Sequence, residues 1–115
     1  MIKAGTAVVL ILFLITGCTP HPGAGVWIAP GANADDITKV EVLFERKVKI
    51  YSSASNEPAL QCGWWAIDKQ TLEMECVYLV NTEKKVKYQL KVIGTDAAEL
   101  QKEARLVTKL FRQRD

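Results

Sequence analysis

The sequence lacks most of the residue patterns that carry enzymatic chemistry. Its 115 residues include one histidine, His21, which excludes the two-histidine zinc motif HExxH, and they contain no glycine-rich dinucleotide motif and no P-loop. His21 lies between two prolines, which favours a solvated linker position over a catalytic one. We therefore expect no catalytic residue, no metal site and no cofactor, and we predict that the chain is not an enzyme.

The sequence also lacks a large excess of charge of one sign and a long apolar run. Fifteen basic and thirteen acidic residues give a net charge of +2, which is too little for electrostatic binding of nucleic acid. The uninterrupted apolar run at residues 7–15 spans nine residues, whereas a membrane-spanning helix needs about 20. Lys3 precedes this run and small residues follow it, a pattern that predicts a secretory signal peptide.

The apolar run ends in the four residues Ile-Thr-Gly-Cys, at positions 15–18. This ending resembles the lipobox of bacterial lipoproteins, in which a branched apolar residue and two small residues precede a cysteine. The resemblance implies that residues 1–17 are removed, that the Cys18 thiol carries diacylglycerol and that the new amino terminus is acylated. Two or three acyl chains give stable anchoring, whereas a single chain binds only marginally. Because Thr19 rather than aspartate follows Cys18, the resemblance also implies the outer membrane, with the domain facing the periplasm.

The segment after Cys18 has the composition of a tether. Residues 19–31 contain three prolines, three glycines and no charged residue. Trp27 and its apolar neighbours interrupt this stretch, and we expect them to dock either as a short edge strand or against interfacial lipid. The expected organisation is a signal peptide at residues 1–17, the lipidated cysteine and tether at 18–32, and one small domain at 33–115.

The three cysteines are an odd number, which requires an explanation in an exported protein. If Cys18 carries lipid, Cys62 and Cys76 remain, and an oxidising compartment favours a disulfide between them. Residues 60–67 and 72–80 have the pattern of two strands, and a turn at 68–70 would place the two cysteines directly opposite each other. A metal site is the alternative, but two cysteines without a partner histidine rarely hold zinc.

Residues 33–51 fit two structures. Asn33 followed by acidic residues is typical of a helix start, and apolar residues then recur on one helical face. The same stretch also alternates between apolar and charged residues, and its β-branched content favours a strand. We expect a short helical turn at residues 33–37 followed by one strand or two short ones, and the helical alternative stays open. Residues 86–92 alternate as a further strand.

The C-terminal residues fit an amphipathic helix. Asp96 and Glu99 have the spacing of a capping box. Apolar side chains then recur at helical spacing, with basic residues elsewhere on the surface: Leu100, Ala104, Val107 and Phe111. The expected fold is therefore α+β, a small antiparallel sheet of three to four strands with this C-terminal helix packed across one face.

With no catalytic site expected, the predicted activity is binding. Trp64 and Trp65 point to opposite faces of their strand, and Trp65 is the candidate contact with a partner, because exposed tryptophans are common at binding hot spots. We expect a non-enzymatic accessory or assembly factor of an envelope complex, with an envelope protein as partner and a lipid anchor in the membrane. The alternative is a small periplasmic or surface lipoprotein that inhibits an enzyme or binds a ligand through the polar loop at residues 52–58.

Overall fold

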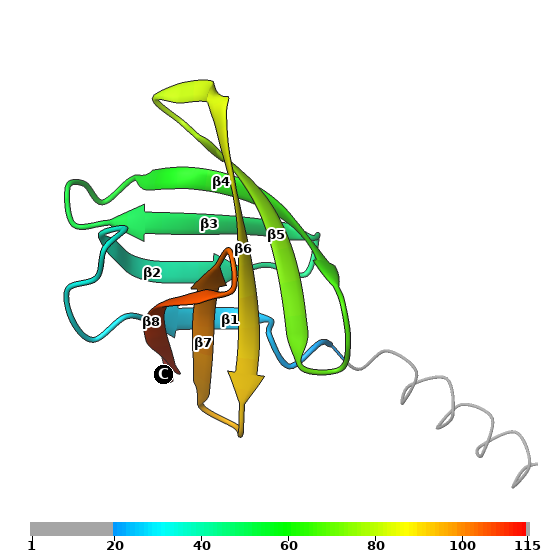
Figure 1. The fold of residues 1–115 in the computed structure, drawn as a ribbon. Coiled ribbons are helices and arrows are strands. Elements are labelled where there is room, and N and C mark those ends of the chain that lie inside the picture. The colour runs from blue at the N-terminus through cyan, green and yellow to red at the C-terminus, as the bar shows by residue number, and fades with distance from the viewer. Residues whose placement is uncertain (1–19, 115) are drawn as a thin grey trace, which may run out of the picture.

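The chain folds as a closed barrel of eight antiparallel strands (Figure 1). The structure is a computed structural model that describes residues 20–114. Each strand pairs with the next one along the chain, and β8 returns to pair with β1. The strands are β1 (Gly25–Ile28), β2 (Ile37–Val42), β3 (Lys47–Ser52), β4 (Pro58–Ala66), β5 (Thr71–Tyr78), β6 (Asn81–Ile93), β7 (Ala97–Lys102) and β8 (Arg105–Arg112).

The barrel contradicts the expected α+β fold of three to four strands and a C-terminal helix. The residues predicted to form that helix form the β7–β8 hairpin, with Leu100 and Leu110 buried inside the barrel. Phe111 belonged to the buried face of the predicted helix, yet its side chain is 48% exposed. The helical prediction is wrong because two short strands joined by a tight turn space their apolar residues at intervals that imitate a helical repeat.

The turn between β7 and β8 carries no sequence signal. Its central residues are Glu103 and Ala104, with φ angles of 53° and 64°. A two-residue hairpin turn of type I′ requires positive φ at both positions, and asparagine and glycine are the residues that normally supply it. Because neither is present here, the break between the two strands is invisible in the sequence.

Alternate residues of the strands point into the barrel and fill it. An eight-stranded barrel has an interior just wide enough for side chains or for one small ligand. Here apolar side chains occupy it: Trp27, Ile37, Val40, Val42, Val48, Ile50, Leu60, Cys62, Leu72, Met74, Cys76, Tyr88, Leu90, Val92, Ala98, Leu100 and Leu110. A partner of this barrel must therefore bind on its outside or at its rim.

The segment that fitted two structures forms β2 and β3. Asn33 does not begin a helix; instead its amide oxygen accepts a hydrogen bond from the Ile37 N–H at 2.9 Å, and its amide nitrogen donates to the Ile37 carbonyl at 2.8 Å. Upstream, β1 forms within the expected tether, and Trp27 of β1 is 0% exposed. The barrel thus begins inside the segment whose proline and glycine content predicted a linker.

The up-and-down topology separates the turns into two groups at opposite ends of the barrel. The turns at residues 43–46, 67–70 and 94–96 lie at the end where Pro20 begins the described chain, which we call the near end. The connections β1–β2, β3–β4, β5–β6 and β7–β8 lie at the opposite, far end. Within residues 20–114, no helix has the length and apolarity needed to cross a membrane.

Candidate functional site

A polar cluster lies at the far end of the barrel interior. Tyr88 of β6 is 1% exposed, and its hydroxyl donates to a carboxylate oxygen of Asp35 at 2.6 Å. Asp35, in the β1–β2 connection, also pairs with the Lys102 ammonium at 3.0 Å. Burial and the adjacent Asp35 carboxylate raise the pKa of Tyr88 well above its ordinary value. Burial by itself would raise the pKa of Asp35, but the bonds from Tyr88 and Lys102 together hold it below its ordinary value.

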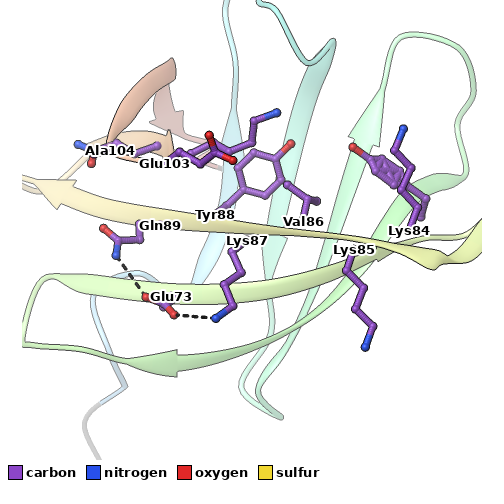
Figure 2. Close-up of a pocket in the computed structure, with 12 residues that line it drawn as sticks. Glu73, Lys84, Lys85, Val86, Lys87, Tyr88, Gln89, Glu103 and Ala104 are labelled. Atoms are coloured by element: carbon purple, nitrogen blue, oxygen red, sulfur yellow. Dashed lines mark hydrogen bonds and ion pairs between the residues drawn. The ribbon is translucent and has the colours of Figure 1, made fainter.

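A groove of about 660 Å³ runs beside this cluster (Figure 2). One wall is β6, another is the β7–β8 turn, and Glu73 of β5 closes the outer side. Glu73 accepts a hydrogen bond from the Gln89 amide at 3.2 Å and lies 4.0 Å from the Lys87 ammonium. The remaining lining residues come from the end of β5, from β6 and from the β7–β8 hairpin: Tyr78, Lys84, Lys85, Val86, Tyr88, Gln101, Lys102, Glu103 and Ala104.

The groove follows a stretch of β6 that, within the described residues, has a neighbouring strand on one side only. β6 pairs with β5 along its length but with β7 over only five residue pairs at its C-terminal end. In an antiparallel sheet, the N–H and C=O of one residue point to the same neighbour, and successive residues alternate between the two neighbours. Val92 donates its N–H to the carbonyl of Gln70, just before β5, at 2.8 Å. Counting back in steps of two, the backbone groups of Leu90, Tyr88 and Val86 also face β5. The backbone groups of Lys87 and Lys85 therefore point away from β5, to the side that has no strand among residues 20–114.

Positive charge is concentrated along this unpaired edge. Lys84, Lys85 and Lys87 are all exposed, and Lys84 lies 4.7 Å from the centre of the Tyr78 ring. In the described part of the chain, no group of three or more histidine, cysteine, aspartate and glutamate side chains is placed to hold a metal ion. Unpaired backbone groups, three lysines and the partly exposed ring of Tyr78 together form a surface suited to binding an extended chain.

Trp65, the partner contact predicted from the sequence, is not one of the residues that line this groove. It is 40% exposed on the outer wall of β4 and pairs across the sheet with Glu73, which lines the groove. Trp64 points to the other face, packs against the core and donates its indole N–H to the Leu43 carbonyl at 2.8 Å. The two tryptophans therefore differ: Trp64 is part of the fold, and Trp65 lies on the outer surface, opposite a residue that lines the groove.

The predicted cysteine pair lies inside the barrel and does not line the groove. Cys62 and Cys76 form a disulfide between β4 and β5, and both are buried. The two strands pair with Cys62 opposite Cys76 and Ala66 opposite Leu72, the register that a turn at residues 68–70 predicts. The disulfide fastens two core strands together. Cys18, the predicted lipidation site, lies outside the described residues.

The polar loop at residues 52–58, the expected contact if the protein inhibits an enzyme or binds a ligand, is short and lies at the far end. Residues 53–57 connect β3 to β4 and are exposed. The Ser53 hydroxyl lies 2.8 Å from each carboxylate oxygen of Asp36, which ties the loop to the β1–β2 connection. The loop is therefore held against the rim of the barrel.

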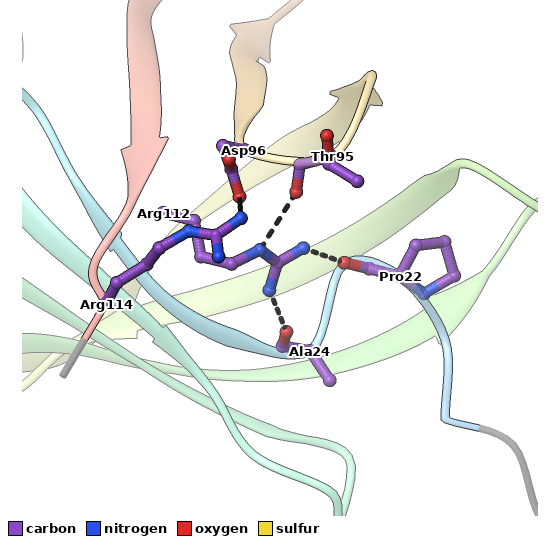
Figure 3. A network of polar contacts seen from close by, with 6 residues as sticks. All are labelled: Pro22, Ala24, Thr95, Asp96, Arg112 and Arg114. Carbon is purple, nitrogen blue, oxygen red and sulfur yellow. Dashed lines mark hydrogen bonds and ion pairs between the residues drawn. The ribbon is translucent and has the colours of Figure 1, made fainter.

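At the near end, a side-chain network that the sequence analysis missed secures barrel closure (Figure 3). β1 and β8 share only two residue pairs. Arg112 of β8 compensates by donating to the carbonyls of Pro22 at 2.7 Å, Ala24 at 2.8 Å and Thr95 at 3.1 Å. Its guanidinium also lies 4.3 Å from the centre of the Trp27 ring. No motif marks this network, because three of its contacts are to backbone carbonyls that any residue could provide.

The segment before β1 is fixed to the same end of the barrel. His21 is not a free linker residue: its Nε2 donates to the Asp68 carbonyl at 2.8 Å, and its Nδ1 accepts from the Gly23 N–H at 3.0 Å. Gly25 has a φ of 126°, and a Cβ there would lie 2.8 Å from Nη1 of Arg112. These contacts fix the point at which the N-terminal segment meets the barrel.

Comparisons with known proteins bear on the fold. No protein-family model and no curated protein sequence matches the chain. The crystal structure of Treponema pallidum Tp0751 (Pallilysin) is similar, with a TM-score of 0.55 and 12% sequence identity over 96% of this chain and 97% of that chain. At this identity the likeness shows a shared fold and nothing about activity. The chain is thus similar in fold to Tp0751.

Proposed function

We propose that this chain is a lipid-anchored envelope protein that works without catalysis, as an accessory or assembly factor of an envelope complex. In this proposal, lipid on Cys18 holds it at the outer membrane facing the periplasm, and the groove beside β6 binds a protein partner. The observation that carries the proposal is the position of the groove. It lies toward the far end, whereas the chain meets the barrel at the near end.

This arrangement suits a tethered binding protein. Pro20 follows Cys18 by two residues, so an anchor at Cys18 would hold the near end at the membrane and present the groove to partners. The packed interior supports the same proposal, because it leaves the rim and the outer wall as the surfaces on which a partner can bind. Tethering raises the effective concentration of the groove near membrane-bound partners, so a modest binding surface suffices.

Site-specific photocrosslinking in native membranes tests this proposal. A photoreactive amino acid replaces exposed Lys87 in the groove or, as a matched control, exposed Lys109 on β8. We expect crosslinking from position 87 to one envelope protein and no such product from position 109. Direct binding of the purified partner should then depend on the groove.

Other outcomes would change the assignment. Crosslinking of the same proteins from both positions, or of none, would contradict binding in the groove. Capture of a soluble hydrolase would select the inhibitor alternative instead. Intact mass spectrometry tests the anchor separately, because the proposal requires a mature chain that begins at Cys18 and carries added acyl chains.

A further inference from the structure

The unpaired stretch of β6 combines three features that point to one kind of partner. Among the described residues its backbone is free on one side, a groove lies along that side, and three of its exposed side chains are lysines, Lys84, Lys85 and Lys87. We infer that an extended acidic segment of the protein partner binds here by adding a strand to β6. This inference rests on the proposed function, in which the groove is the binding site for an envelope protein.

The backbone provides the first part of the recognition. Lys85 and Lys87 direct their N–H and C=O groups to the side of β6 that has no strand in the described part of the chain. An added strand would lie about 4.8 Å away and pair with these groups as β7 pairs with the rest of β6. β7 ends at Lys102, and the chain turns back at Glu103, so the groove begins where regular pairing stops.

The side chains provide the second part. Successive residues of an added strand point to opposite faces of the sheet. On β6, Lys85 and Lys87 lie on the outer face, while Lys84 lies on the inner face beside Tyr78. A segment with acidic residues at neighbouring positions would therefore meet lysines on both faces, and opposite charges directly across a sheet attract.

The same lysines exclude other partners. Lysine on a strand edge discourages pairing with other chains, because an incoming neutral strand must displace water from the ammonium groups and a basic strand is repelled. An acidic strand turns that barrier into attraction. The edge is thus protected against general aggregation while remaining open to a partner of complementary charge.

A pair of substitutions separates backbone pairing from charge. Lys87→Pro removes the N–H that faces the groove and leaves the β5–β6 hydrogen bonds, which Val86 and Tyr88 make on the other side. Lys87→Thr removes the same charge and keeps the N–H. The probe is a ten-residue peptide in which pairs of adjacent glutamates alternate with pairs of valines, so that glutamates point to both faces. A peptide with lysine in place of glutamate is the control, and both are titrated into the mature lipidated protein in detergent micelles.

We expect the glutamate peptide to bind and the lysine peptide not to bind. Binding should slow hydrogen exchange at the amides of Lys85 and Lys87 at least tenfold. Lys87→Pro should weaken binding at least tenfold, and Lys87→Thr only two- to threefold. If Lys87→Pro does not fold, strand addition is still tested by the slower amide exchange at Lys85 and Lys87 of the unmodified protein when the glutamate peptide binds.

Two results would overturn the inference. The first is no binding of the glutamate peptide. The second is binding that leaves exchange at these amides unchanged, because it would show side-chain attraction without strand addition. Either could occur while photocrosslinking from position 87 still captures an envelope protein, so the proposed function and this inference fail separately.

Discussion

Replacing Ala104 with glycine should stabilise the protein, and the sign of the effect tests the β7–β8 hairpin. Ala104 has a φ of 64° and is exposed. A residue with a Cβ pays about 1–2 kcal/mol for the left-handed conformation, whereas glycine adopts it without a clash. Glycine also gives the unfolded chain more freedom, which costs about 0.5–1 kcal/mol. The net expectation is a free energy of unfolding higher by about 0.5–1 kcal/mol.

In a helix the same substitution would have the opposite effect. Glycine in a helix interior is less favourable than alanine by about 0.8–1.0 kcal/mol. In the barrel the side chain of Ala104 is exposed, so glycine loses little packing and the backbone conformation decides the sign. In the predicted helix Ala104 lies on the packed face, so glycine would lose packing as well. The two structures thus predict opposite signs for the change in stability caused by Ala104→Gly. The β7–β8 hairpin predicts a gain, and the C-terminal helix predicted from the sequence would give a loss.

Urea unfolding followed by tryptophan fluorescence provides the assay. For a domain of this size, about 0.5–1 kcal/mol corresponds to a rise in Tm of roughly 2–8 °C. Ala97→Gly is the matched control, because Ala97 lies within β7, where glycine should destabilise by about 0.5–1 kcal/mol. A lower midpoint for Ala104→Gly, comparable to that of the control, would refute the assignment of a left-handed turn.

Three further predictions concern the contacts that hold the barrel together. Arg112→Ala should lower the free energy of unfolding by about 2–3 kcal/mol in urea titrations, since it removes three charged hydrogen bonds and a cation–π contact. Arg112→Lys should recover less than half of this lost stability. A urea midpoint that Arg112→Ala leaves unchanged would contradict the network. The pKa of Asp35 is lowered in the folded protein. Its ionised carboxylate therefore stabilises the fold at pH values above its ordinary pKa of 3.8, and this stabilisation is lost as the pH falls through the folded pKa. Asp35→Asn should therefore be less stable at pH 7 and lose less stability in acid, and parallel pH curves would argue against this. Reducing the Cys62–Cys76 bond, whose cysteines are 14 residues apart, should cost about 3 kcal/mol by loop entropy, as measured with and without dithiothreitol.

Strands with regular alternation could be predicted from the sequence. β4 and β5 follow the expected pattern, and the position of their turn was enough to place Cys62 opposite Cys76. Both features depend on residues close together in the chain. Local information of this kind survives in the sequence because one face of each strand must be apolar to fill the barrel.

Features that depend on distant residues could not be predicted. β1 is stabilised by Arg112, which contacts the carbonyls of Ala24 and Pro22 across 88 and 90 residues of sequence. Composition placed this segment in a tether, and the apolar residues around Trp27 left two expectations open, a short edge strand or docking against lipid. The groove depends on β6 extending beyond β7, which ends at the turn at Glu103 and Ala104. Because no asparagine or glycine marks that turn, the end of β7 leaves no pattern in the sequence.

The most direct test of the central claim is partner recovery from native membranes after charge reversal in the groove. The double variant Lys85→Glu/Lys87→Glu is compared with Lys69→Glu/Lys109→Glu, which makes the same charge change at exposed positions outside the groove. Each variant places a glutamate opposite another glutamate, Glu75 across from position 87 and Glu99 across from position 109, so we predict that both lose a similar, small amount of stability. Only the groove variant should lose the envelope protein captured from position 87. Retention of that protein by the groove variant, or equal loss from both, would contradict binding beside β6.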